Sequence, residues 1–216
     1  ILWRSSSQWL GGFLFLLVTI GTIGSKQIKI KPAYLITGGA SGKNFYNNFN
    51  YNFIKILLIY LVSTIFIIFL YSLINVRLFD SFNLAFTTIS SGGFIPSSNL
   101  SDIIKDDLQI FVVALTLLLP IFNFFLLHDI FTRQFSLSRN QEDIHLGILV
   151  IIVTVFLYFF VLSYEGFANV FFAIVSSVST SGITTYSSNY NMSLFFILLT
   201  IIGGSVISTS SGFKYT

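Results

Sequence analysis

Long apolar runs alternate with polar segments along this chain. Five runs approach the roughly 20 residues that a helix needs to cross a bilayer, and they cover residues 9–23, 53–74, 108–127, 146–162 and 192–207. Two of the intervening segments, residues 76–107 and 163–191, are themselves partly apolar and contain tracts of Ser, Thr and Gly. The pattern predicts an all-α integral membrane protein whose crossing helices are separated by irregular segments.

The composition supports this class and disfavours others. Hydrophobic residues make up 54% of the chain and charged residues only 9%, whereas soluble domains carry about 25% charged residues. With 26 Phe and only 3 Pro, the apolar runs suit helices better than the short strands of a barrel. The chain has no Cys and only 2 His, and neither a paired carboxylate nor a nucleophile with a base is apparent. We therefore expect no enzymatic activity, no bound cofactor and no nucleic-acid partner, with membrane lipid as the surroundings.

The charged residues gather in two linkers. Residues 25–55 contain five Lys and no acidic residue, which marks this side as cytoplasmic by the positive-inside rule. Residues 128–145 carry a more balanced set of charges, which is a weaker indication that this linker is also cytoplasmic. From each linker the chain runs through one apolar run, an interrupted segment and a second apolar run, so both linkers are expected on the same side.

The two interrupted segments resemble each other. Residues 80–86 match residues 165–171, since each stretch starts with an acidic residue and continues as a short apolar run. A Ser/Thr/Gly tract follows in both, and Ser-Ser-Asn comes later, at residues 97–99 and 187–189. This is an internal repeat of roughly 90 residues.

The short apolar runs at residues 82–89 and 167–178 predict helices that enter the membrane only part of the way. Asp80 and Glu165 are expected either to cap their N-termini or to form an outer acidic site that concentrates cations. Non-helical backbone at membrane depth must be buried in protein or line a cavity, so the tracts that follow are expected to face a pore or a binding site. Their carbonyl and hydroxyl oxygens would suit a monovalent cation. The competing interpretation, two ordinary loops with Gly and Ser at turns, is disfavoured by the repeat.

The tracts resemble a known family. FTTISSGGF at residues 86–94 and STSGITT at 179–185 are similar to filter loops of the Trk/Ktr/HKT potassium transporters. Further similarities to the bacterial TrkH branch lie at Trp3-Arg4-Ser5 with QWLGG at 8–12, at Asn123-Phe124 with Leu127-His128, and at Gly203-Gly204 with STSSGFK at 208–214. They span nearly the whole chain in the order of the family.

The resemblance implies a fold of four repeats, each a helix, a pore helix with filter loop, and a helix, arranged with pseudo-fourfold symmetry. It assigns residues 1–24 to the second helix of repeat one, 56–128 to repeat two and 146–216 to repeat three up to its broken helix, with cytoplasmic linkers at 25–55 and 129–145. Two of four filter loops are present, so we expect a fragment of the full transporter. The alternative is a non-conducting membrane remnant or scaffold of a truncated gene.

Site residues follow from the same resemblance. The potassium-binding filter would be formed by Ser91, Gly92, Gly93, Phe94, Thr180, Ser181, Gly182 and Ile183, with Gly93 and Gly182 central. The intramembrane gate loop would comprise Gly203, Gly204, Ser208, Thr209, Ser210, Ser211, Gly212 and Lys214. Lys214 is either a membrane-edge residue whose ammonium reaches water or a charge beside the conduction path.

The implied function is potassium uptake through a multi-pass transporter of the cell inner (cytoplasmic) membrane. Membrane potential would drive it, or symport with protons. Potassium would be the substrate and the only metal ion bound. The resemblance also implies a homodimer and a cytoplasmic nucleotide-binding regulatory subunit of the TrkA type.

Overall fold

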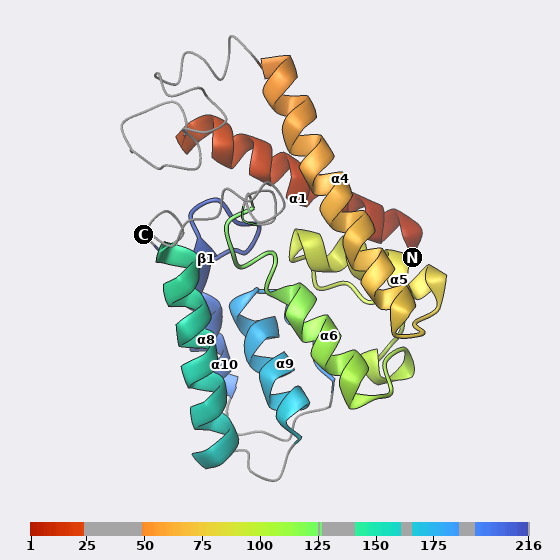
Figure 1. Ribbon diagram of the computed structural model, residues 1–216, viewed down its shortest axis with the longest axis vertical. Helices are drawn as coiled ribbons and strands as arrows, with labels where there is room; N and C mark the ends of the chain where they lie inside the picture. The colour runs from red at the N-terminus through yellow and green to blue at the C-terminus, as the bar shows by residue number, and fades with distance from the viewer. Residues whose placement is uncertain (24–48, 125, 127–140, 161–165, 186–192, 216) are drawn as a thin grey trace.

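The computed structural model describes the whole chain except residues 24–48, 125, 127–140, 161–165, 186–192 and 216. The described part is mostly helical (Figure 1). In chain order its elements are α1 (Leu2–Ile23), α4 (Phe49–Leu73), α5 (Leu78–Ser90), the 3-10 helix η1 (Leu100–Asp102), α6 (Asp107–Leu117), α8 (Gln141–Phe160), α9 (Phe167–Val178), α10 (Ser193–Ile201), β1 (Ile202–Ser205) and β2 (Phe213–Tyr215).

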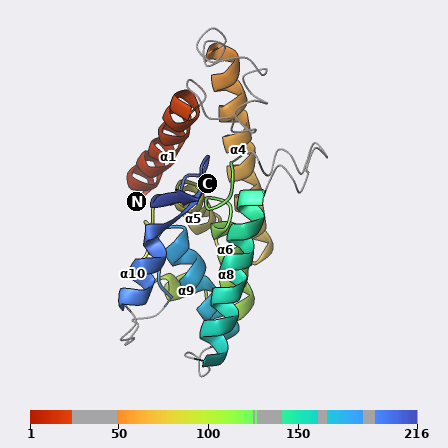
Figure 2. The ribbon, with the colours of Figure 1, turned by 90° about the vertical axis from the view of Figure 1, so that its left-hand side faces the viewer.

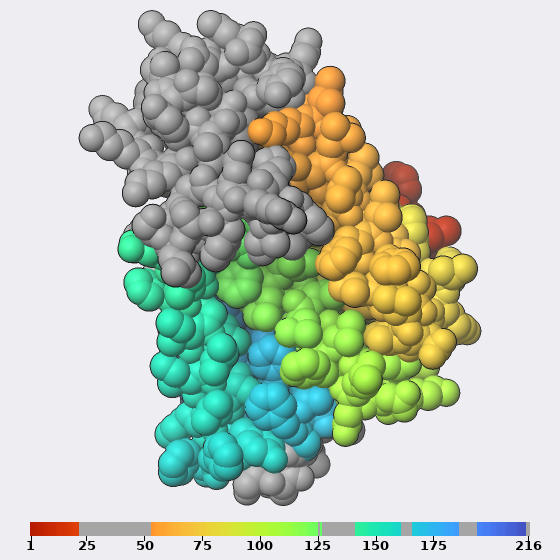
Figure 3. All heavy atoms as spheres, in the orientation of Figure 1, coloured from red at the N-terminus to blue at the C-terminus, as the bar shows by residue number. Residues whose placement is uncertain are grey.

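Two helices are long and apolar enough to cross a membrane over Phe53–Leu73 and Gln141–Phe160. They are α4 and α8, and both expose large apolar side chains, among them Ile65, Phe69 and Phe159. An outward apolar surface of this kind is expected where a helix meets lipid. On the face shown in Figure 3, α8 and α4 lie at the two sides, with α6 and α9 between them.

The helices α5 and α9 are short, as the sequence predicted for helices that enter the membrane only part of the way. They contain 13 and 12 residues, which at 1.5 Å per residue is about 20 Å and 18 Å, well short of the roughly 30 Å hydrocarbon core. Each is packed against a long helix, α5 against α4 and α9 against α8. In addition α1 packs against α5 in the way that α6 packs against α9 (Figures 1 and 2). The same arrangement of three helices therefore occurs twice.

The structure corrects the register of the repeat. The short helices begin at Leu78 and Phe167, which are 89 positions apart, whereas the sequence match placed residue 80 against residue 165. The match was therefore wrong by four residues. A shift of four is about one helical turn, so it leaves the apolar face of a helix almost unchanged and escapes detection by pattern alone.

The second helix of each repeat unit stops inside its apolar run. The run at 108–127 was expected to be one helix, but α6 ends at Leu117 and is followed by turns. Pro120 explains this, because proline has no N–H to donate and its ring clashes with the carbonyl four residues earlier. In the run at 192–207, where the sequence predicts a broken helix, α10 ends at Ile201 and continues as the extended strand β1.

Polar groups tie the helices of repeat two together in the core. The hydroxyl of Tyr71 on α4 lies 3.0 Å from Thr88 Oγ1 on α5 and 2.6 Å from Thr116 Oγ1 on α6, and all three residues are buried. One side chain thus joins three helices. Because a buried polar group is stabilising only when it is paired, this contact also fixes how α5 is oriented.

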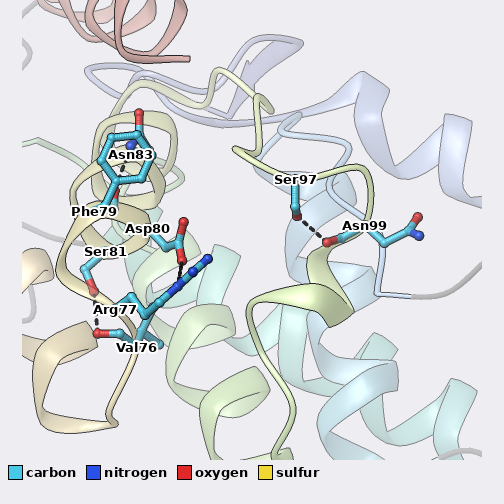
Figure 4. A network of polar contacts seen from close by, with 8 residues as sticks. All are labelled: Val76, Arg77, Phe79, Asp80, Ser81, Asn83, Ser97 and Asn99. Carbon is cyan, nitrogen blue, oxygen red and sulfur yellow. Dashed lines mark hydrogen bonds and ion pairs between the residues drawn. The ribbon is translucent and has the colours of Figure 1, made fainter.

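Asp80 lies in the first turn of α5 and is buried (Figure 4). Its carboxylate accepts a hydrogen bond from Arg77 Nε at 2.7 Å, and its charge is favourable at the positive end of the helix. The N-cap position is held by Arg77 itself, without a side-chain cap. Asp80 therefore lies near the helix N-terminus without capping it, and because it is buried it does not form an open acidic site. Glu165 and most of both cytoplasmic linkers lie outside the described residues, so the orientation of the chain stays a prediction.

Replacing Tyr71 by Phe tests the contact between α4, α5 and α6. We expect Tyr71→Phe to lower the free energy of unfolding by about 1 kcal/mol, because Thr88 and Thr116 still bond to carbonyls of their own helices. This corresponds to a fall in Tm of about 2–4 °C, measurable by thermal unfolding in mild detergent. Tyr158→Phe on α8 is the matched control. If Tyr71→Phe lowers the Tm no more than Tyr158→Phe does, the hydrogen bonds of Tyr71 do not stabilise the contact between the three helices.

Candidate functional site

The first candidate loop, residues 91–94, follows α5 directly. Ser91 and Gly93 both have left-handed backbone torsions, with φ of 54° and 72°. The N–H of Gly92 donates to Thr87 O at 2.9 Å, and the hydroxyl of Thr87 lies 2.5 Å from Phe94 O. The last turn of α5 therefore holds the loop at both ends.

The second candidate loop, residues 180–183, has the same geometry after α9. Thr180 and Gly182 are left-handed, with φ of 59° and 64°, and they lie 89 positions after the two left-handed residues of the first loop. The N–H of Ser181 donates to Ser176 O at 3.2 Å, and the Ser176 hydroxyl donates to Ile183 O at 2.6 Å. Matching torsions and matching hydrogen bonds make the two loops structural equivalents.

The two loops touch each other. A Cβ added at Gly93 would overlap the carbonyl oxygen of Ser181, so the backbones lie in contact although 88 residues separate these positions in the chain. Only glycine permits such an approach together with a positive φ. At Gly182 the same Cβ would meet no heavy atom within 4 Å in the described part of the chain. The loops are thus neighbouring walls of one site.

The hydroxyl groups of the second loop face the protein. Ser181 Oγ lies 3.0 Å from Ser179 Oγ and 3.2 Å from Ser176 Oγ, and Thr180 Oγ1 donates to Ser179 O at 2.7 Å. These hydroxyls stabilise the turn, so the oxygens left to bind a cation there are backbone carbonyls. In the first loop Ser91 Oγ is buried without a hydrogen-bond partner among the described residues, which makes it a further candidate ligand.

Side chains from α1 support the first loop. Gln8 Nε2 donates to Gly92 O at 2.6 Å, and Gln8 Oε1 accepts from the hydroxyl of Thr87 at 2.8 Å. The guanidinium of Arg4 lies 4.3 Å from the ring centroid of Phe94, within cation–π range. Sequence reasoning assigned no role to Gln8 or Thr87. The repeat could have revealed Thr87, because in the correct register it aligns with Ser176.

The candidate gate segment, residues 203–214, is closely packed in its central part. Strand β1 pairs in parallel with β2. A Cβ at Gly203 would lie 2.5 Å from Phe213 O, and one at Gly204 would overlap Ile121 O. Paired glycines usually weaken a helix, and in this structure they also permit close backbone contact.

Backbone hydrogen bonds join this segment to the turns that follow α6. Ser205 N–H donates to Ile121 O at 2.9 Å and Ser210 N–H donates to Pro120 O at 3.0 Å. In the opposite direction Phe124 N–H donates to Ile207 O at 2.7 Å. The broken ends of the two second helices therefore satisfy each other's backbone groups.

The tip of the segment reaches both candidate loops. Thr209 Oγ1 donates to Ile89 O at the end of α5, at 2.9 Å. Ser211 N–H donates to Thr180 Oγ1 at 3.1 Å. The structure thus brings all three predicted groups of site residues into one cluster.

Lys214 turns back onto its own segment. Its ammonium donates to Ser208 Oγ at 2.9 Å, to Ser208 O at 3.1 Å and to Ser210 O. The ammonium of a membrane-edge lysine would extend into water, whereas this one is bound to residues of its own segment. A place beside the conduction path stays a prediction.

The arrangement of helices and loops described above matches the fold of a solved structure. The crystal structure of the potassium transporter TrkH from Vibrio parahaemolyticus matches 96% of this chain with a TM-score of 0.73 and 20% sequence identity. The predicted likeness to the TrkH branch is thereby confirmed at the level of the fold.

The sequence comparison points the same way. The chain is 27% identical to an uncharacterized cation transporter of Methanocaldococcus jannaschii, over an alignment of 220 positions that covers 99% of the chain. No protein-family model matches the chain. The chain spans 44% of the length of this relative and 44% of the TrkH chain.

Three alanine substitutions separate close contact from backbone strain. Gly182→Ala should cost about 1–2 kcal/mol because of its positive φ, and Gly93→Ala should cost about 1–3 kcal/mol more because of overlap with Ser181. Gly11→Ala, in an open position on α1, should stabilise by about 0.5–1 kcal/mol. Denaturant titration in mild detergent measures the free energy of unfolding of each variant and so ranks the three. Equal losses of unfolding free energy in Gly93→Ala and Gly182→Ala would show that the loops are not in contact.

Proposed function

We propose that residues 91–94 and 180–183 are two adjacent walls of a cation filter in a TrkH-type transporter, and that the transporter takes up potassium across the cytoplasmic membrane. The observation that carries the proposal is the contact between Gly93 and Ser181. It joins two loops of equal conformation, as expected of neighbouring repeats around one ion pathway.

The chemistry of the two loops suits a monovalent cation. None of their eight residues is charged, so an ion would meet neutral oxygens only. Backbone carbonyls can replace the hydration shell of such an ion without binding it too tightly to leave. The membrane potential supplies about 2.3 kcal/mol per charge for each 100 mV. This free energy favours the inward movement of a cation through such a path.

Residues 203–214 are proposed to act as the gate. Their tip contacts Ile89 and Thr180, which belong to the two half-helices and loops of the filter. A movement of the segment away from the loops would break these two hydrogen bonds and open the path from the cytoplasmic side.

The assembly and its surroundings are proposed from the resemblance to the TrkH branch. They comprise a multi-pass topology in the inner membrane, a homodimer, and regulation by a cytoplasmic nucleotide-binding subunit of the TrkA type. Proton symport is proposed on the same basis. The cytoplasmic linkers that would meet a regulatory subunit lie mostly outside the described residues.

A chimera tests the transport function. The 216 residues would replace the matched segment of the Methanocaldococcus jannaschii relative, and the purified chimera would be reconstituted in vesicles with an inward potassium or sodium gradient. We expect potassium flux well above that of empty vesicles. Introducing Gly93→Ala should reduce the potassium flux at least about tenfold, because the added methyl group displaces the loop backbone. A rise of only about 1.4 kcal/mol in the barrier to ion passage already has that effect.

Gly11→Ala in the same chimera is the control, because it changes a glycine on α1 that lies outside both loops. Flux that is unaffected by Gly93→Ala would contradict the filter assignment. Sodium flux equal to potassium flux would retain the cation pathway but reject potassium selectivity. A folded chimera with no flux would favour a non-conducting scaffold.

A further inference from the structure

The ammonium of Lys214 lies in a cluster of protein oxygens that resembles an ion site. We propose that Ser208 and Ser210 form a second monovalent-cation site, and that Lys214 occupies it as a tethered competitor of the transported ion. The regulatory meaning of this site rests on the function proposed above, whereas the existence of the site does not.

The ligand set carries the inference. A lysine ammonium has three donors, and those of Lys214 meet a hydroxyl and two backbone carbonyls, from Ser208 and Ser210. The ring of Phe15 lies 5.8 Å from Nζ and adds a cation–π contact. Neutral oxygens and an aromatic face are ligands that bind potassium as well as ammonium, because both are monovalent cations that accept carbonyl oxygens in place of water.

The absence of an acidic partner distinguishes this lysine from an ordinary structural one. A partly buried charge is usually paired with an opposite charge, because removal from water is costly. Among the residues that the structure describes, no carboxylate forms a salt bridge with Lys214. Its compensation comes from neutral dipoles alone, as for an ion in a filter.

The oxygens are held in place without the lysine. Ser208 and Ser210 are 1% and 0% exposed, and their hydroxyls lie 3.1 Å apart. Gly204 N–H donates to Ser210 Oγ, and Ser210 N–H donates to Pro120 O, both at 3.0 Å. A preformed cluster of this kind would remain after Lys214 is removed and would then accept a free cation.

The position of the site gives it a regulatory meaning. Thr209, between the two ligand residues, bonds to the end of α5 directly before the first candidate loop. With Lys214 in place, a positive charge lies next to the ion path and disfavours a second cation. When the side chain withdraws, the same oxygens become available to the transported ion.

Thermal unfolding of the 216-residue chain in detergent tests the site without any transport assay. In Lys214→Met the apolar side chain leaves the oxygens free. We expect replacement of choline chloride by potassium chloride at equal ionic strength to raise the Tm of this variant by about 5 °C more than that of the unaltered protein. Ammonium chloride should act in the same way, since it restores the group that was removed.

Two further variants make the result specific. Lys105→Met, at an exposed lysine, is the matched control and should respond to potassium like the unaltered protein. Adding Ser208→Ala to Lys214→Met removes one ligand and should abolish most of the extra shift. If Lys214→Met does not fold, Lys214→Gln takes its place in the same comparison.

The proposal is overturned if potassium stabilises Lys214→Met no more than the unaltered protein, or if Ser208→Ala leaves the extra shift unchanged. Binding at the filter is distinguished by Gly93→Ala, which should not reduce the extra shift. An extra shift without flux in the chimera would support this site and reject the transport function. Flux in the chimera without an extra shift in Tm would support the transport function and reject this site.

Discussion

The constraint on which this structure depends is that backbone groups at membrane depth need partners, because no water is present there to supply them. Two helices of the chain break inside the apolar region, after Leu117 and after Ile201. Their irregular ends exchange hydrogen bonds with each other, from residues 120–124 to residues 205–210. This mutual pairing allows the extended candidate gate segment to exist beside the candidate filter. It also fixes the position of that segment relative to α5 and α9.

Glycine serves this pairing through its small size more than through flexibility. Gly203 and Gly204 of the candidate gate each lie where a methyl group would strike a backbone oxygen. Gly93 is in the same situation against the second loop. A gate built in this way would move as a packed unit that breaks several hydrogen bonds together, which favours two discrete states over gradual bending.

Much of the site could be predicted from the sequence, because the half-helices and their polar tracts have a strong local signal. The long helices α4 and α8 were likewise clear from apolar length alone. What local patterns could not reveal were contacts between distant segments, such as Gln8 with the first loop or the exchange between the two broken ends. The register error of four residues has a related cause, since helical periodicity is nearly blind to a shift of one turn. The first residues of the two helices and the left-handed residues after them resolve it.

The contact between the two loops is directional. Gly93 of the first loop meets Ser181 of the second, but Ser181 is equivalent to Gly92 and not to Gly93. Each loop therefore has two different edges, and the interface is head-to-tail, the kind that generates a ring with a defined sense of rotation. The free edge at Gly182 corresponds to the edge that Gly93 uses. The proposed ion path would thus have a defined handedness, and any further wall of it would have to join in the same rotational sense.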